Sequence, residues 1–414
     1  MTKYLMILFA FLLSCNPMSE EERIALKALQ IHAGILTIDS HTDTPLYLTR
    51  PGYDFASRQD AKSHGSKLDI PRMKDGGLDA VFFAVFVGQG ERSEAGNEKA
   101  FKRAELVFDS VLAVISRNSG EVEIAFNPED AFRLKEAGKR AIFVGLENGY
   151  PIGNDLSLIR HIYDRGARYI TLCHTANNDI CDSSTDSTEF NGLSEFGENV
   201  VREMNQLGMM IDVSHISDSA FFDVIRLSTV PVIASHSSAR AICDNPRNLN
   251  DEMLVALAGN GGVIQVCLLS DYVKKMPPNP ERDSVMAGLR VKYRNYSELS
   301  DAEMDSARVE WRAMNQKFPP NLATVKDYVD HIDHIVAVAG IDHVGIGSDF
   351  DGGGGLEDCF DVSQFPNITI ELVRRGYSEE DIRKIWGENL FRVMREVNSK
   401  AGSEGINYTS LIKK

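Results

Sequence analysis

Eight short apolar runs, rich in Ile, Val, Leu and Phe, recur along the chain from residue 34 onward, separated by longer amphipathic stretches. Such continuous apolar runs are typical of strands buried on both faces of a parallel sheet, because a strand with one solvated face alternates apolar and polar residues. The pattern therefore predicts eight parallel strands. The runs cover residues 34–43, 78–87, 141–149, 168–174, 209–215, 231–237, 262–268 and 343–352.

The fold that eight strand and helix units predict is α/β, a (β/α)8 TIM-type barrel, which takes about 250 residues without insertions. We expect one domain over residues 34–400, with a polar connection at 50–75, an inserted segment at 269–325 before strand eight, and a C-terminal helical tail. The tail pattern, at 378–397, is expected on the outside of the barrel, and 401–414 form a C-terminal tail. Helices are predicted over residues 97–117, 154–166, 196–207, 217–228, 250–259 and 322–339.

The first fifteen residues, "MTKYLMILFAFLLSC", carry an early Lys and an apolar run too short to span a bilayer. We interpret residues 1–14 as a signal peptide. The end, "LLSC", resembles the lipobox of bacterial lipoproteins, which makes Cys15 a candidate for lipidation and residues 15–33 an attachment cysteine with a linker. A plain secretory signal or a buried N-terminal helix is the alternative. The lipoprotein interpretation places the chain in the bacterial cell envelope, anchored to a membrane outside the cytoplasm.

The net charge bears on the class of partner, and the cysteines bear on zinc-ribbon and disulfide patterns. A net charge of −16 without a dense basic patch argues against nucleic acid, which binds clustered Lys and Arg. Five cysteines follow Cys15, an odd number without a CxxC pair, so no zinc-ribbon pattern is present. Cys173 and Cys181 lie close enough in sequence to pair in an oxidising compartment, and buried free thiols are the alternative.

Titratable side chains stand at the ends of six of the predicted strands. In a barrel of this kind the active site lies at the carboxyl ends of the strands. A single histidine there is more often structural than a metal ligand, but barrel closure brings distant strand ends around one mouth. The sequence therefore predicts a cluster of imidazoles and carboxylates. Its members are His41, Asp43, Glu147, His174, His215, His236, Asp349 and Asp351.

This cluster is suited to metal ions. His41 and Asp43 are two residues apart in an extended chain, so both side chains face the same way and can bind one ion. Glu147 has two carboxylate oxygens and can bridge two ions, and His215 and His236 can complete the second. Mixed nitrogen and oxygen ligands suit zinc, although manganese, cobalt or iron would also be acceptable.

Other candidate motifs are assigned structural roles. His331 and His334 share one helical face, but their helix precedes strand eight and should lie outside the barrel. "DGGGG" at 351–355 lacks the Lys and Ser/Thr of a P-loop, so we interpret it as a flexible turn at the rim. Ser237 and Ser238 lack the GxSxG pattern of a nucleophile elbow. Asp39 either orients a ligand or holds the turn.

Six motifs in the order of one known family span most of the body. On them the chain resembles the membrane dipeptidase (renal dipeptidase) family of zinc metallopeptidases, as a bacterial lipoprotein-like member. The inserted segment is a departure, in a region that helps to close the site in this family. The motifs are "DSHTDTP" from Asp39, "GLENG" from Gly145, "TLCHTANN" from Thr171, "DVSHIS" from Asp212, "ASHSSARAICDNPRN" from Ala234 and "VGIGSDFDG" from Val344.

The resemblance implies a role for each matching residue. His41 and Asp43 would hold one zinc ion, Glu147 would bridge, and His215 and His236 would hold the other. His174 would contact the scissile carbonyl, Arg247 the terminal carboxylate of the substrate, and Asp349 would handle protons.

The implied function is a metal-dependent dipeptidase in which a hydroxide bridging two zinc ions attacks the peptide bond of a dipeptide. The family also implies a possible homodimer. Two alternatives stay open at this point. One is a related metal-dependent barrel hydrolase acting on another amide, a lactam, a lactone or a phosphoester, and the other is a catalytically silent envelope lipoprotein.

Overall fold

The computed structural model describes residues 18–62, 65–293, 299 and 301–401. All eight predicted strands are present and pair in parallel in chain order, which confirms the (β/α)8 barrel. Each lies within its predicted run except β4 and β5, which begin one residue earlier. The strands are β1 Ile38–Thr42, β2 Ala80–Phe86, β4 Arg140–Glu147, β5 Ala167–Thr171, β6 Met210–Asp212, β7 Ile233–Ser237, β8 Val263–Cys267 and β9 Val344–Gly347.

The first and last strands close the barrel through a seam of single contacts. Thr42 and Phe350 form an isolated parallel bridge. The Asp349 N–H donates to His41 O at 3.0 Å, and the Asp43 N–H donates to Phe350 O at 2.8 Å. Asp39 accepts hydrogen bonds from both the backbone and the side chain of Ser348. The side chain of Asp39 therefore holds this seam.

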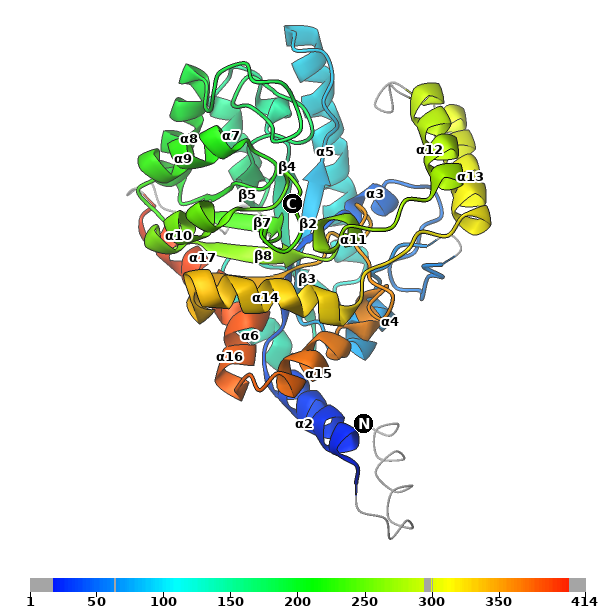
Figure 1. The fold of residues 1–414 in the computed structure, drawn as a ribbon. Coiled ribbons are helices and arrows are strands. Elements are labelled where there is room, and N and C mark those ends of the chain that lie inside the picture. The colour runs from blue at the N-terminus through cyan, green and yellow to red at the C-terminus, as the bar shows by residue number, and fades with distance from the viewer. Residues whose placement is uncertain (1–17, 63–64, 294–298, 300, 402–414) are drawn as a thin grey trace.

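Helices surround the barrel (Figure 1), and many begin at a Ser, Thr or Asn whose side chain accepts a backbone N–H, as Ser93, Ser194 and Thr324 do. All six predicted helices are present. Several helices were not predicted, among them α2, α6, α12, α13 and α15. The short strand β3 Val122–Ile124, which pairs with β4, was not predicted either. The longer helices are α2 Glu20–Gly34, α5 Glu94–Arg117, α6 Pro128–Glu136, α7 Ser157–Asp164, α8 Glu195–Leu207, α9 Asp218–Leu227, α10 Asp251–Gly259, α12 Pro280–Lys292, α13 Asp301–Lys317, α14 Val325–Ala339, α15 Pro366–Arg374 and α17 Asn389–Ser399. The shorter ones are α3 Pro45–Leu48, α4 Ile70–Asp75, α11 Ser270–Val273 and α16 Glu379–Arg383.

Side chains alternate between two cores along each strand. On β2, Val81 and Phe83 pack toward the helices, while Phe82 points into the barrel and stacks on Phe143 at 4.9 Å between ring centroids. Phe391 of α17 joins this inner cluster. The helical tail therefore packs on the outside of the barrel, as predicted, and it does so at the amino ends of the strands, where it covers the inner core.

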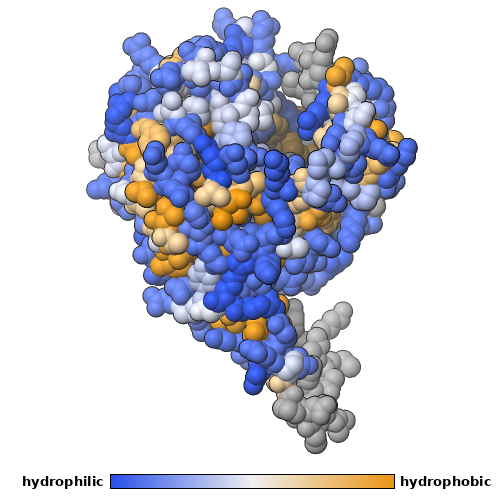
Figure 2. Space-filling model, in the orientation of Figure 1, coloured by the Kyte–Doolittle hydropathy of each residue, from blue (hydrophilic) through white to orange (hydrophobic). Residues whose placement is uncertain are grey.

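The inserted segment 269–325 contains α11, α12 and α13. The last two form a hairpin that stands away from the barrel (Figure 1) and has a small core of its own around Leu289, Tyr293 and Met314. Figure 2 shows the surface hollowed between this hairpin and the main body.

The segment before the barrel is more ordered than a linker. Helix α2 occupies most of residues 15–33 and docks through the buried His32, whose Nδ1 lies 2.7 Å from Thr369 Oγ1 and whose Nε2 lies 2.9 Å from Gly76 O. The predicted signal peptide and Cys15 lie outside the described residues. Within the described ranges, none of the helices has the length and apolar character needed to cross a membrane.

Candidate metal centre

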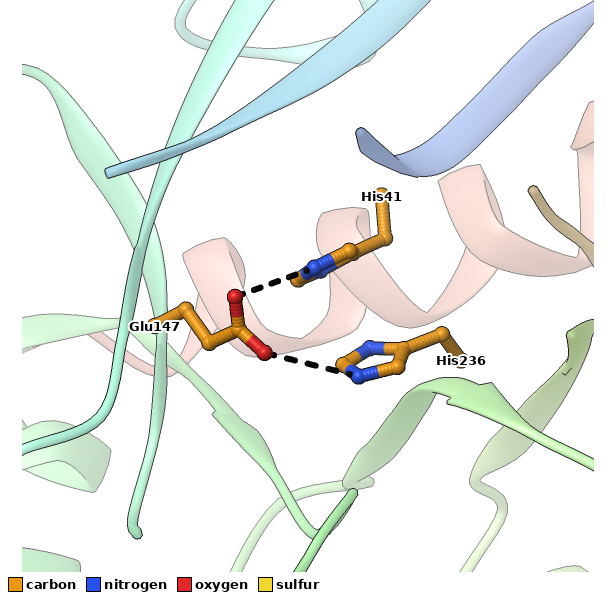
Figure 3. Close-up of side chains that lie close together, drawn as sticks. All are labelled: His41, Glu147 and His236. Atoms are coloured by element: carbon orange, nitrogen blue, oxygen red, sulfur yellow. Dashed lines mark ion pairs between the residues drawn. The ribbon is translucent and has the colours of Figure 1, made fainter. Parts of the chain in front are cut away.

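Glu147, the last residue of β4, lies at the centre of the predicted cluster. Its Oε2 is 3.3 Å from His41 Nε2 and its Oε1 is 3.6 Å from His236 Nε2. Figure 3 shows the two imidazole rings facing this carboxylate one above the other, with their centroids 3.8 Å apart. All three side chains are buried. Strand ends that are distant in sequence thus converge on one carboxylate.

Two further histidines approach the same carboxylate. His215 Nε2 lies 3.3 Å and His174 Nε2 3.7 Å from Glu147 Oε1. The Nε2 atoms of His215 and His236 are 2.8 Å apart. The His174 side chain keeps 23% of its surface exposed, whereas that of His215 keeps 5%. His174 therefore lies at the open side of the cluster, where a substrate would arrive.

Two aspartates complete the group beside His41. Asp43 Oδ2 lies 3.7 Å from His41 Nε2. One ligand atom each of His41, Asp43 and Asp349 falls within 4.8 Å of the others. The same spacing joins His41, Glu147 and His236, and also Glu147, His174 and His215. The structure therefore brings together all five residues predicted as metal ligands, and places His174 and Asp349 among them.

The backbone is strained where it presents these side chains. His215 has φ 73°, Asp349 has φ 54°, and Asn148, directly after Glu147, has φ 74°. A non-glycine residue in this left-handed region costs about 1–3 kcal/mol, and such residues cluster at active sites. Here the left-handed conformation turns the backbone sharply at the ends of the strands, so that the ligand side chains point into the mouth of the barrel.

The hydrogen bonds behind His41 identify its free nitrogen. His41 Nδ1 lies 2.9 Å from the Tyr169 hydroxyl, which itself donates to Ser40 O at 3.4 Å. The phenol oxygen therefore accepts from His41 Nδ1–H, and the lone pair of His41 is on Nε2. This Nε2 and Asp43 Oδ1 are buried without a hydrogen-bond partner among the described residues. A lone pair facing carboxylates in a buried site fits a bound cation.

Burial governs the protonation of the cluster. It lowers the pKa of His215 and His236 well below the usual value, and nearby positive groups, including Arg247, add to this effect. Burial and then Arg247 lower the pKa of His174 to about 4. Burial and then Asp43 raise the pKa of Asp349 well above its usual value. His174, His215 and His236 are thus held neutral, which is the form that binds metal ions. Against the effect of burial, Tyr169 and the carboxylates Glu147 and Asp43 raise the pKa of His41 well above its usual value, so a cation bound at Nε2 would take the place of a proton there.

Arg247 lies buried beside the cluster. Its Nη2 donates to His236 O at 3.1 Å, and its guanidinium carbon lies 5.3 Å from the centre of the Tyr272 ring. The side chain makes no salt bridge, and its Nε has no hydrogen-bond partner, within the part of the chain that the structure describes. A buried guanidinium in this position can accept a carboxylate as a bidentate partner.

The glycine loop after Asp349 packs against the cluster. A Cβ on Gly352 would stand 2.1 Å from Asp43 Oδ2 and 2.3 Å from Asp349 Oδ1. Asp351 turns away from the cluster and accepts hydrogen bonds from Thr44, Ser66 and the Lys67 N–H. The loop is therefore held by contacts on both sides.

The two histidines assigned structural roles, His331 and His334, make hydrogen bonds away from the cluster. His331 bridges the Ala239 N–H and Val273 O, at 3.0 and 2.8 Å, and His334 pairs with Asp251. The sequence also missed the outer partners of the ligands, Tyr169, Asp212 and Ser235, although Asp212 opens the quoted motif "DVSHIS". The five cysteines after Cys15 are buried and free.

A parallel barrel with buried imidazole and carboxylate donors at the carboxyl ends of its strands is the architecture of a metallohydrolase. The family model for membrane dipeptidase (Peptidase family M19) matches residues 26–405. The chain belongs to this family, and so to the metal-dependent peptidases that hydrolyse dipeptides.

Named relatives agree with this assignment. The chain is 32% identical over 375 residues to dipeptidase tcpJ of Claviceps purpurea, covering 88% of this chain and 78% of the relative. It is 30% identical over 390 residues to dipeptidase 3 of Rattus norvegicus, covering 91% and 68%.

Solved structures share the fold. The probable dipeptidase PvdM of Pseudomonas aeruginosa superposes with a TM-score of 0.79 at 32% identity, covering 92% of this chain and 99% of that one. A metallo peptidase of Rhodobacter sphaeroides, solved with a phosphinate mimic of the dipeptide L-Ala-D-Ala, gives 0.71 at 22% identity, covering 88% and 99%. At that lower identity the likeness concerns the fold.

Proposed function

We propose that the chain hydrolyses the peptide bond of dipeptides with two zinc ions held by five residues. The observation that carries the proposal is the buried Nε2 of His41, which faces two carboxylates and has no hydrogen-bond partner among the described residues. Mixed imidazole and carboxylate donors suit zinc, and Glu147 faces both groups of histidines. The proposed ligands are His41, Asp43, Glu147, His215 and His236.

When bound, the ions would supply Lewis acidity and lower the pKa of a water molecule to about 7. The chain supplies the other parts. His174, neutral and at the open side, donates a hydrogen bond to the carbonyl oxygen of the scissile bond as negative charge develops there. The positive charge of bound ions would favour the ionised form of Asp349 against the effect of burial, and the carboxylate would then accept a proton from the attacking water and deliver it to the leaving nitrogen.

Arg247 sets the length of the substrate. Its guanidinium is buried next to His236 and lacks a carboxylate partner among the described side chains. A free carboxylate of the substrate would fill that role. Because Arg247 adjoins the proposed metal ligands, the carboxylate it binds must lie close to the scissile bond. This geometry favours a dipeptide over an internal bond of a longer peptide.

The test is a metal-reconstituted assay on dipeptides with L or D residues at the second position, with longer peptides as negative controls. Chelation should abolish hydrolysis, zinc should restore it, and the wild type should bind two equivalents. Glu147→Gln should reduce hydrolysis by more than roughly 100-fold, since loss of outer-shell partners alone costs about 10–100-fold. Glu371→Gln is the matched control, because Glu371 is a buried carboxylate of α15 that pairs with Arg374 and Arg375.

A Glu147→Gln variant that kept both its stoichiometric zinc and its hydrolysis would rule out the bridging role. A chelator-treated wild type that stayed fully active would rule out the metal itself.

We also propose that the chain is exported and lipid-anchored through Cys15, which rests on the "LLSC" motif alone. Labelling of cells with a tagged fatty acid should mark the wild type and not Cys15→Ala. Equal labelling of both would place the lipid elsewhere.

A further inference from the structure

Asp212, the last residue of β6, is a fully buried carboxylate outside the proposed ligand set. Within the described ranges no salt bridge joins it to a basic side chain. A buried charge is costly unless hydrogen bonds or an opposite charge compensate it. The surroundings of Asp212 therefore show what it is for.

Four groups donate to Asp212. The backbone N–H groups of Ser214 and Ser235 donate to Oδ1 at 3.0 and 2.8 Å. The hydroxyls of Thr171 and Ser235 donate to Oδ2 at 2.5 and 2.6 Å. One carboxylate oxygen thus takes both backbone donors, and the other takes both hydroxyls.

This arrangement fixes the direction of the next hydrogen bond. The Ser235 hydroxyl has one hydrogen, and Asp212 takes it. The lone pair of Ser235 Oγ then faces His236 Nδ1 at 2.8 Å, so Nδ1 must carry the ring hydrogen. His236 Nε2 is left with its lone pair, and it lies 2.8 Å from His215 Nε2 and 3.6 Å from Glu147 Oε1. The same hydroxyl is 3.5 Å from His41 Nδ1, which Tyr169 contacts at 2.9 Å, so the effect falls on His236.

We infer that Asp212 is a positioning residue that acts through Ser235 to hold His236 in the form that binds metal through Nε2. The neutral Tyr169 holds His41 in the same way. The two ions of the proposed centre are therefore supported unequally, and Asp212 favours the one that binds His236. This inference rests on the proposed function.

Asp212→Asn gives the sharpest test because it reverses the hydrogen-bond direction. The amide oxygen would keep the two backbone donors, so the amide nitrogen would face the two hydroxyls. Ser235 must then accept from the amide and turn its hydrogen toward His236 Nδ1, which moves the ring hydrogen to Nε2. Ser235→Ala removes the connection with a change of one oxygen atom and covers the case in which Asp212→Asn fails to fold. Thr171→Val is the matched control, since it removes a donor to the same oxygen without touching His236.

The readouts are zinc affinity by chelator competition and the tautomer of His236 from nitrogen-15 shifts of the metal-free protein. We expect Asp212→Asn and Ser235→Ala to weaken the binding of one of the two zinc ions by roughly 10–100-fold. We expect Asp212→Asn to move His236 to the Nε2–H form, and Thr171→Val to change neither property.

If Asp212→Asn and Ser235→Ala both kept the wild-type zinc affinity and the wild-type tautomer of His236, the inference would be overturned. A loss of affinity in Thr171→Val as large as in Asp212→Asn would also overturn it, because the effect would then be structural. Failure of the proposed function can be told apart from failure of this inference. If the wild type bound no zinc, the proposed function would fail, but the tautomer of His236 could still be measured in the metal-free protein.

Discussion

Gly352→Ala tests whether the glycine loop shapes the metal centre. The added Cβ would stand 2.1 Å from Asp43 Oδ2 and 2.3 Å from Asp349 Oδ1, where ordinary contact begins near 3.4 Å. Both neighbours are short side chains in a buried site, and the loop behind Gly352 is held by the hydrogen bonds of Asp351. Neither side has room to retreat, so Asp43, Asp349 or the loop must move by roughly 1 Å.

A displacement of this size at a reacting group costs about 100-fold in rate, or about 2.7 kcal/mol in the activation barrier. We expect kcat/KM for a dipeptide to fall by that factor in Gly352→Ala and zinc affinity to weaken as well. The protein should remain folded, because the clash lies at the rim of the barrel and not in its core.

The assay is steady-state hydrolysis with zinc content measured on the same preparation. Gly259→Ala is the control, since a Cβ at the end of α10 meets nothing within 4 Å. Wild-type kcat/KM and zinc content in Gly352→Ala would show that the loop yields freely, and the steric reasoning would then be wrong.

Two further predictions concern the buried guanidinium of Arg247 and the buried imidazole of His32. Arg247→Ala should raise KM for a dipeptide by about 10–100-fold, since a hydrogen bond to a charged group contributes about 1.5–3 kcal/mol, and should leave hydrolysis of the C-terminal amide unchanged. Equal losses for both substrates would contradict carboxylate capture. Burial lowers the pKa of His32, so the unfolded chain takes up a proton that the native state excludes, and stability falls as pH drops below about 6.5. His32→Gln should therefore destabilise the protein more at pH 7.5 than at pH 5.5 in urea unfolding, and an unchanged difference would refute this.

The strands could be predicted because the parallel barrel buries both faces of each, which leaves long apolar runs in the sequence. The strand β3 has only three residues, two of them half-buried, so its run was too short to recognise. Helix α2 falls in the stretch predicted as a linker, between the predicted signal peptide and the first apolar run. It is held in place by His32 and Thr369, a contact between residues 337 positions apart.

The metal-facing residues were predictable for the same topological reason, since every one follows an apolar run. Their hydrogen-bond partners were not. Tyr169 lies within a strand, where an aromatic residue needs no further explanation, and Gly145 opposite it has no Cβ that would meet the ring. Asp351 lies only two residues after Asp349 at the end of the same strand, yet its side chain turns to Thr44, which only the three-dimensional loop decides. The roles assigned to individual site residues stay predictions.

The seam between β1 and β9 has a consequence for the order of events during synthesis. His41 lies near the start of the chain and Asp349 near its end, and each helps to hold the other through the Asp349 N–H. A nascent chain that has not yet emerged from the ribosome beyond Asp351 lacks this contact, so it cannot assemble the complete centre. With the proposed ligands, metal loading would report that the whole barrel has been made, because the centre needs residues from both ends of the chain.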